Sequence, residues 1–320
     1  MRIFTADDDA VEWSSSSPSP LTDAAVAART RAFLAAAAAL PPAPPPRAST
    51  CCLQGEAAIV SGAGLVGSAE ATTCVIALCF ARGGSSSSAL AAHLSGAKDA
   101  HAFSSLVARL ADAVPGAALE LSLVGAFDPR ALAASRGTCE AVLAALGQQR
   151  DELRVKLVVA CVGEANTRRE GTRSWPRVTA AAVDAATGVV LGAALATQLF
   201  AADAVPFEVE RRARLWLDGP GAALELLPAS LCGPEPPASP PPELARALQG
   251  PWAMSAFDCH YFLSLPDQEL LRATSTSPDA EHASYASTMR SVLRFVLARL
   301  PDGEKGGARA EKAQQGCRPS

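Results

Sequence analysis

The fold is decided by residues 74–93, CVIALCFARGGSSSSALAAH, in which two short apolar stretches flank a pair of glycines. Its first seven and last seven residues have the length and composition of buried strands. The residues between them contain Gly83-Gly84, the residue type that tight turns favour. The sequence therefore predicts a β-hairpin that turns on these glycines, and in that register Cys74 lies directly opposite His93.

Further strands and helices are predicted on both sides of this hairpin. Strands are expected at residues 57–61, 119–124 and 155–161, with a second hairpin formed by 177–184 and 188–194; helices are expected at 22–40, 103–114, 132–146, 267–274 and 289–300. Strands that return through hairpins, with helices between some of them, indicate an α+β or mixed α/β fold. We expect a layered sandwich of mainly antiparallel sheet with flanking helices.

Proline-rich and polar segments divide the chain. Residues 1–48 are predicted to form an Ala/Pro-rich N-terminal helix and linker, and residues 49–300 a single catalytic domain. Residues 234–243, PEPPASPPPE, read as an exposed insertion in that domain. Residues 301–320 are polar and rich in Gly, Lys and Glu, which predicts a disordered tail.

Composition excludes several classes of protein. The formal net charge of −4 argues against nucleic-acid binding, which usually needs a basic face. Neither a secretory signal nor a membrane-spanning stretch is recognised, so no membrane partner is expected. The nine cysteines are irregularly spaced, without CxxC pairs, and predict free thiols in a reducing cytoplasmic or nuclear compartment. No metal or cofactor is expected.

One motif suggests a different function. Residues 62–67, GAGLVG, match the GxGxxG pattern of dinucleotide-binding folds and follow a predicted strand. The next stretch is too short and too rich in Val, Ile and Cys for the helix that should carry the pyrophosphate. No carboxylate that could bind a ribose lies between Ala71 and Lys98, although Arg82 would suit NADP. An NADP-binding oxidoreductase therefore stays open as an alternative, beside a plain flexible turn.

Cys74 and His93 are the candidates for catalysis. A cysteine nucleophile needs a thiolate, and an adjacent imidazole lowers the thiol pKa and holds the proton for the leaving group. Residues that face each other across a hairpin have Cβ atoms about 4.5–5.5 Å apart. A register shift of two residues would place His93 on a diagonal, roughly 7–8 Å away but on the same face.

Five segments carry a resemblance to a known family. They are residues 67–74 (GSAEATTC), 92–96 (AHLSG), 119–127 (LELSLVGAF), 161–166 (CVGEAN) and 275–281 (STSPDAE). In this order they resemble motifs of the protein N-terminal asparagine amidohydrolase family, whose third motif ends in Val-Gly-Gly-Phe. The resemblance covers roughly residues 50 to 300 as islands. Val75 and the Pro-rich insertion depart from the family pattern.

The resemblance implies an activity and a fold. The family deamidates an N-terminal asparagine of a protein to aspartate in the N-degron pathway. Its expected partners are therefore protein substrates that begin with Asn, together with other components of that pathway. The family is similar to bacterial deamidases of the CheD and cytotoxic-necrotizing-factor type, which pair a Cys with a His on an α/β sandwich. A catalytic pair of Cys74 and His93 is implied here. The alternative is an inactive interaction protein that keeps this fold.

Deamidation also needs an oxyanion site and recognition of the substrate's α-ammonium group. Backbone N–H groups of Thr73 and Cys74, or a hydroxyl of Thr72 or Ser68, could bind the oxyanion, although both threonines are also ordinary strand formers. A carboxylate is the natural partner of the ammonium. Glu281 is the first choice, with Glu164 and Glu70 in reserve, and Glu281 also reads as part of a helix start. Ser275 and Ser277 are expected to line the same pocket.

Overall fold

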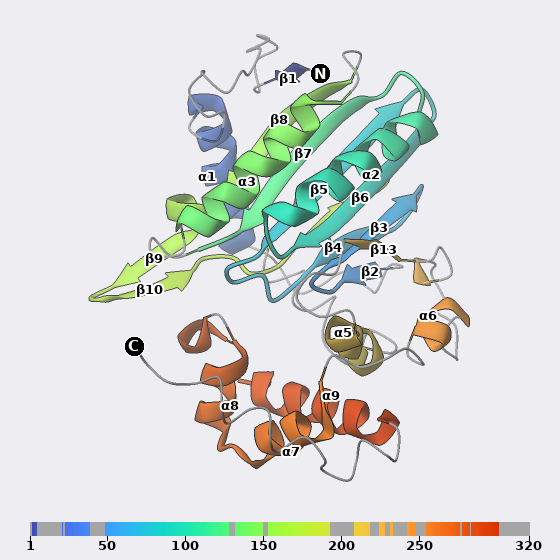
Figure 1. Cartoon of the computed structure of the whole chain (residues 1–320). Helices are drawn as coiled ribbons and strands as arrows, with labels where there is room; N and C mark the ends of the chain where they lie inside the picture. Colours follow the sequence, from blue (N-terminus) through green and yellow to red (C-terminus); the bar gives the residue numbers. More distant parts are fainter. Residues whose placement is uncertain are drawn as a thin grey trace. The chain divides into compact units, whose positions relative to one another are not determined.

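The computed structural model describes residues 2–4, 21, 23–38, 49–127, 132–149, 153–192, 208–217, 224–227, 231–232, 242–247, 254–275, 277–281 and 283–300. The chain divides into two compact units (Figure 1). The first consists of Met1–Pro206 and Ala223–Pro241, and the second of Phe207–Ala222 and Pro242–Ser320.

Parts of the predicted organisation lie outside the described residues. These parts are the linker at 41–48, all but the last two residues of the Pro-rich segment 234–243, and the tail at 301–320. Their predicted character stays a prediction, as do the boundaries of a single catalytic domain.

Within its described residues, the first unit contains a large sheet of seven strands and a small sheet of four. The large sheet has the order β1-β8-β7-β5-β6-β3-β13, and the small sheet the order β12-β11-β4-β2. The strands of the large sheet are β1 (Arg2–Phe4), β3 (Glu56–Ser61), β5 (Val75–Gly83), β6 (Ser86–Leu94), β7 (Ala118–Gly125), β8 (Arg154–Cys161) and β13 (Glu225–Leu226). Those of the small sheet are β2 (Ser49–Cys52), β4 (Leu65–Ser68), β11 (Ala181–Asp184) and β12 (Val190–Leu191).

Strand directions are mixed. At the centre of the large sheet, the neighbouring strands β7, β5, β6 and β3 pair antiparallel. At one edge, β8 pairs in parallel with both β1 and β7. A separate hairpin is formed by β9 (Thr167–Glu170) and β10 (Arg173–Pro176). The predicted α+β layered fold is confirmed, with antiparallel strands at the centre of the large sheet and parallel pairs toward its edges.

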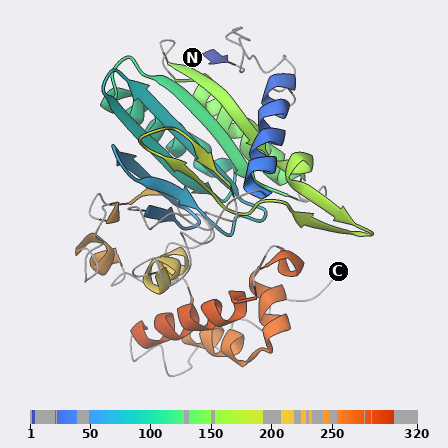
Figure 2. The same cartoon turned by 180° about the vertical axis from the view of Figure 1, so that it is seen from behind.

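Different layers cover the two faces of the large sheet, as Figures 1 and 2 show from opposite sides. Helices α2 (Ala100–Ala113) and α3 (Leu132–Gly147) pack on one face, whereas α1 (Ala24–Ala38) and the small sheet pack on the other. Side chains of β5 alternate between them: Val75, Ala77 and Cys79 pack with the core under α2 and α3, and Ile76, Leu78 and Phe80 with the core under the small sheet. A strand buried on both faces needs apolar residues at every position, which explains its continuous apolar run.

The register of the β5–β6 hairpin differs from the prediction. Gly83 pairs with Ser86, and Gly84 is the first of the two loop residues, with φ +55°. A positive φ at that position alone is the pattern of a type II′ turn. Gly83 stays in the ladder, where an added Cβ would lie 2.9 Å from the carbonyl oxygen of Pro115. The turn thus lies one residue further along, and the predicted direct pairing of Cys74 with His93 is wrong.

The GxGxxG-like segment 62–67 does not open a helix. Its second half is in strand β4, which pairs with β2 and β11 in the small sheet. An added Cβ at Gly67 would lie 2.2 Å from the Ala181 carbonyl oxygen, so this glycine permits close packing of two strands. Because a dinucleotide-binding motif needs a helix N-terminus at this point, the structural basis for the NADP alternative is missing.

The second unit is helical in its described residues. It contains α5 (Glu208–Leu217), α6 (Pro242–Ala247), α7 (Ala256–Ser264), α8 (Asp267–Thr274) and α9 (Tyr285–Arg299). Buried side chains of α5, α7, α8 and α9 form its core. A capping box between Ser255 and Asp258 begins α7, and the Arg290 guanidinium of α9 donates to the Leu263 and Leu265 carbonyls at 2.8 and 2.7 Å.

Most of the predicted elements are present. The helix at 267–274 is found with those bounds, and the final helix begins four residues earlier than predicted, at Tyr285. Strands β2 and β4 and the β9–β10 hairpin were not predicted. No helix among the described residues has the length and apolarity that a membrane crossing requires.

Candidate active site

Cys74 directly precedes β5, and its side chain is half-buried against the core under the small sheet. Two backbone hydrogen bonds hold the segment that leads to it. The Ala126 N–H donates to the Cys74 carbonyl at 2.7 Å, and the Phe127 N–H donates to the Thr72 carbonyl at 3.0 Å. The end of β7 therefore fixes the backbone on both sides of Thr73.

His93 is in β6, and only 3% of its surface is exposed. It pairs with Ile76, so it is a diagonal neighbour of Cys74 rather than its direct partner. Its position in the strand alternates with those of Leu94 and Ala92, which face α2 and α3, so its ring lies on the side of the small sheet. Cys74 packs on that same side. The structure thus brings the two predicted catalytic residues to one face of the sheet as diagonal neighbours. In a regular antiparallel pair such neighbours are about 7–8 Å apart.

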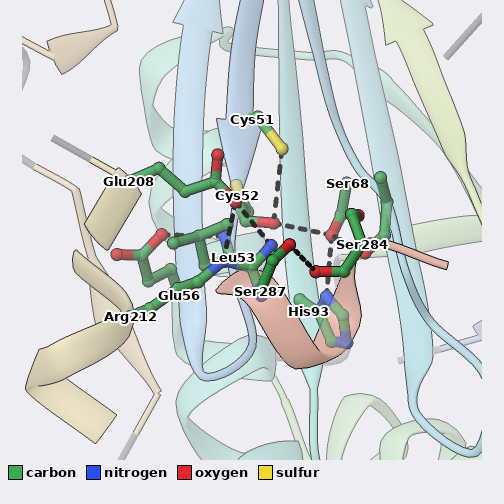
Figure 3. Close-up of polar contacts among 11 residues, drawn as sticks. Cys51, Cys52, Leu53, Glu56, Ser68, His93, Glu208, Arg212, Ser284 and Ser287 are labelled. Carbon is green, nitrogen blue, oxygen red and sulfur yellow. Dashed lines mark hydrogen bonds and ion pairs between the residues drawn. The ribbon is translucent and has the colours of Figure 1, made fainter. Parts of the chain in front are cut away.

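A serine from the small sheet orients the imidazole (Figure 3). The Ser68 hydroxyl donates to the Cys52 carbonyl at 2.6 Å, and its oxygen lies 2.8 Å from Nδ1 of His93. A hydroxyl has one hydrogen, and a carbonyl can only accept. Nδ1 therefore carries the ring hydrogen and donates it to Ser68. In neutral His93 the buried Nε2 then has the lone pair and can accept a proton.

Ser68 itself was predicted as one possible oxyanion donor. Because its hydrogen is used on the Cys52 carbonyl, the geometry favours a role in orienting His93. Thr72 is buried and Thr73 half-buried, in the same segment as Cys74. The oxyanion role of these threonines and of the nearby backbone N–H groups stays a prediction.

The backbone around Cys74 is strained on two sides. Among the described residues other than glycine, a positive φ occurs at Glu70 (60°) and Ala126 (49°), and both flank the Cys74 segment. Such residues cost about 1–3 kcal/mol each and cluster at functional sites. Only glycine fits at position 125, where φ is 112°, because an added Cβ would lie 2.5 Å from the Cys74 carbonyl oxygen.

The three carboxylates predicted to bind the α-ammonium have different surroundings. Glu70 is exposed and lies four residues before Cys74. Glu164 is exposed and forms an ion pair with Arg169. Glu281, in the second unit, accepts hydrogen bonds from the hydroxyls of Ser275 and Ser277, so the three predicted pocket residues of that segment lie together. Its binding role stays a prediction.

Several other cysteines are poor nucleophiles. Burial, with a smaller contribution from Glu120, raises the pKa of the Cys79 thiol to about 12. Burial also raises the pKa values of Cys139 and Cys161 to about 12. These thiols stay protonated at neutral pH, whereas half-buried Cys74 lies on the same side of the sheet as an imidazole. In the described part of the chain, no group of three His, Cys, Asp or Glu side chains is arranged to hold a metal ion.

Two parts of the site were not predicted from the sequence. One is the strand end at Gly125 and Ala126, and the other is Asn166, whose amide bonds to that strand end. The available signal for Asn166 was a polar residue five positions beyond the end of strand β8, in the segment 161–166.

The fold and the site together define a class: α+β proteins that hold a cysteine thiol and an oriented imidazole on one sheet face, an arrangement typical of enzymes with a cysteine nucleophile. The family model described as protein N-terminal asparagine amidohydrolase matches residues 43–227 and 249–315, more than half of the chain. The chain therefore belongs to the protein N-terminal asparagine amidohydrolase family, and the resemblance in its motifs is confirmed.

Curated relatives agree with this assignment. The chain is similar to the protein N-terminal asparagine amidohydrolase of Homo sapiens, with 29% identity over 180 residues, which cover 56% of this chain and 50% of the relative. It is also similar to the protein of that name from Mus musculus, with 29% identity over 188 residues, 58% of this chain and 52% of the relative. The chain thus matches about half the length of these relatives.

Proposed function

We propose that this chain is an amidohydrolase that converts the side-chain amide of a protein's N-terminal asparagine to a carboxylate and releases ammonia. The observation that carries the proposal is the placement of the half-buried Cys74 thiol on the same sheet face as His93, whose ring Ser68 orients. Family membership and the names of the relatives support this choice of substrate.

The proposed reaction has two stages. His93 accepts the Cys74 thiol proton at Nε2, and the thiolate attacks the carboxamide carbon. The carbon–nitrogen bond then breaks, and the proton held by His93 goes to the departing ammonia. In the second stage His93 takes a proton from water, which attacks the thioester. The carbon–sulfur bond then breaks, and the proton held by His93 goes to the Cys74 sulfur. The products are aspartate and the free Cys74 thiol.

The oxyanion and the ammonium group need separate partners. For the oxyanion we propose Thr72 and the backbone N–H groups of Thr73 and Cys74. For the substrate's α-ammonium we propose Glu281, with Glu164 and Glu70 as alternatives. Replacing each glutamate with glutamine separates them: only the true partner raises KM for an Asn-terminal peptide by about 10-fold or more.

A cellular role follows from the proposed substrate. Deamidation of N-terminal asparagine would place the chain in the N-degron pathway of ubiquitin-dependent protein catabolism, in the cytoplasm, the nucleus or both. Its partners would be proteins that begin with Asn and other components of that pathway.

Ammonia release from synthetic peptides tests the proposed activity. A peptide that begins with Asn should be deamidated, a peptide that begins with Gln should react far more slowly, and an N-acetylated Asn peptide should not react. Cys74→Ala should lower the rate by more than about 1,000-fold because the nucleophile is lost. Cys232→Ala is the matched control, since Cys232 is also half-buried but not in the proposed site. Full turnover by Cys74→Ala would rule out the mechanism.

The alternative of an inactive interaction protein makes a different prediction for the thiol. In the enzyme, alkylation of Cys74 by iodoacetamide should proceed well below about pH 8, because the imidazole favours the thiolate. An ordinary thiol profile for Cys74, together with no ammonia release, would favour the inactive protein.

A further inference from the structure

Asn166 is a fully buried amide at the end of a short 3-10 helix, η3 (Gly163–Asn166), directly after β8. Its Nδ2 donates to the carbonyl of Gly125 at 2.9 Å and to that of Val178 at 2.8 Å. Its Oδ1 accepts from the Val178 N–H at 2.8 Å. The side chain therefore ties the end of β7 to the segment before β11, and both hydrogens of its amide are used.

The strand end that Asn166 holds is the one that holds Cys74. Gly125 is followed by Ala126, whose N–H donates to the Cys74 carbonyl at 2.7 Å. The Ala126 carbonyl in turn accepts from the Gly163 N–H at 2.7 Å. Helix η3 thus bonds to both residues of the strand end, once through the Asn166 side chain and once through its own backbone.

This strand end has a backbone that needs support. Gly125 and Ala126 have φ values of 112° and 49°, and positive φ is unfavourable for a residue with a side chain, such as Ala126. Without a bond to the Gly125 carbonyl, Ala126 can relax toward negative φ. Its N–H would then turn away from the Cys74 carbonyl, and the thiol would shift relative to His93.

We propose that Asn166 is a positioning residue for Cys74, acting through Gly125 and Ala126. The proposal rests on the proposed function, in which Cys74 is the nucleophile. An amide suits the position because it offers two N–H donors and one acceptor to two carbonyls and one N–H. An aspartate at this position would place an oxygen where Nδ2 now faces the Gly125 and Val178 carbonyls, and two acceptors repel each other.

Asn166→Ala tests the proposal, with Thr167→Val as the matched control. Thr167 is buried beside Asn166, and its hydroxyl donates to the Gly163 carbonyl at 2.8 Å rather than to Gly125. For Asn166→Ala we expect kcat for the Asn-terminal peptide to fall by on the order of 100-fold with KM nearly unchanged. The pH midpoint of Cys74 alkylation, measured by peptide mapping, should rise toward about 8.5, the value of an ordinary thiol. Thr167→Val should lower thermal stability without either change.

A second variant separates positioning from general support of the fold. Ala126→Gly removes the side chain that disfavours positive φ and keeps the N–H that binds Cys74. In the double variant Asn166→Ala/Ala126→Gly, the proposal predicts partial recovery of kcat and of the alkylation midpoint. Recovery of thermal stability alone would overturn the positioning role.

Each remaining outcome also tests the positioning role of Asn166. If Asn166→Ala keeps the wild-type kcat and alkylation profile, the proposal is wrong. If neither the single nor the double variant folds, Asn166 is required for the fold and the positioning role is overturned. Should the wild-type protein release no ammonia, the proposed function fails, yet the alkylation midpoints of these variants still test whether Asn166 positions Cys74.

Discussion

At the scale of single residues, one hydrogen atom determines what His93 can do. The short contact between Ser68 and the Cys52 carbonyl assigns the serine's hydrogen to that carbonyl. Nδ1 of His93 must then donate, and Nε2 keeps the lone pair. A neutral imidazole that has lost this bond distributes its hydrogen between both nitrogens and can rotate. In the proposed mechanism the serine would therefore contribute to catalysis by orienting His93, without touching the substrate.

Ser68→Ala should lower kcat by about 10- to 100-fold and leave KM nearly unchanged, because the base loses its orientation rather than its chemistry. Imidazole nitrogen NMR shifts should show the Nδ1–H form of His93 in the wild type and a mixture of both forms in the variant. Ser88→Ala is the matched control, since buried Ser88 is in the same strand as His93 and its hydroxyl lies 2.7 Å from that of Ser61. An equal loss of kcat in both variants would contradict the orienting role.

At the scale of elements, local patterns predicted the central strands and helices but not how the strands meet. The apolar run of residues 74–80 predicts strand β5, since few other structures bury every position. The hairpin register depends on which of the two adjacent glycines is in the turn, and the local sequence does not distinguish them. Gly83 is in the ladder, where it lies close to Pro115, a residue remote in sequence. Strand β4 has only four residues, one of them Gly67, so its pairing with β2 and β11 has little local signal. The Ser68–His93 contact depends on that pairing and could not be predicted.

Gly67→Ala tests the packing of the small sheet. The added Cβ would lie 2.2 Å from the Ala181 carbonyl oxygen and 2.5 Å from the Ala182 Cα, and both are backbone atoms that cannot turn aside. We expect a loss of about 1–3 kcal/mol in the free energy of unfolding. Gly96→Ala is the control, because Gly96 has extended backbone at φ 177° and open space around its Cβ position. That control should stay within about 0.5 kcal/mol of the wild type in chemical unfolding, and an equally small effect at Gly67 would contradict the close packing.

At the scale of the whole molecule, each unit has its own hydrophobic core, and the family match includes residues of both units. Cysteines take part in the cores on both faces of the large sheet: Cys79 and Cys139 under α2 and α3, and Cys161 under the small sheet. With few aromatic side chains in the chain, at 5%, small apolar residues supply much of the buried surface. A buried thiol fills such a core as a hydrophobic group only while it keeps its proton.

These thiols should make the first unit sensitive to alkaline pH. An exposed thiol has a pKa of about 8.5, and burial raises the pKa of Cys79, Cys139 and Cys161 to about 12. Above about pH 8.5 the unfolded chain therefore loses protons that the folded chain retains, and unfolding becomes more favourable as pH rises. Below about pH 8.5 the stabilisation is fully present. Each thiol should contribute a slope of about 1.4 kcal/mol per pH unit above about pH 8.5, until the folded thiol also titrates near pH 12.

Chemical unfolding between pH 7 and pH 11, in the wild type and in Cys79→Ala, measures this slope. Lysine and tyrosine side chains also titrate in this range, so the wild-type slope alone does not isolate the thiols. The variant also loses packing around the missing sulfur, but that loss is the same at every pH. The difference between the two curves should therefore be constant below about pH 8.5 and shrink above it, because only the wild type has the Cys79 thiol to lose. Parallel curves up to pH 11 would show that Cys79 is accessible to solvent in the folded protein.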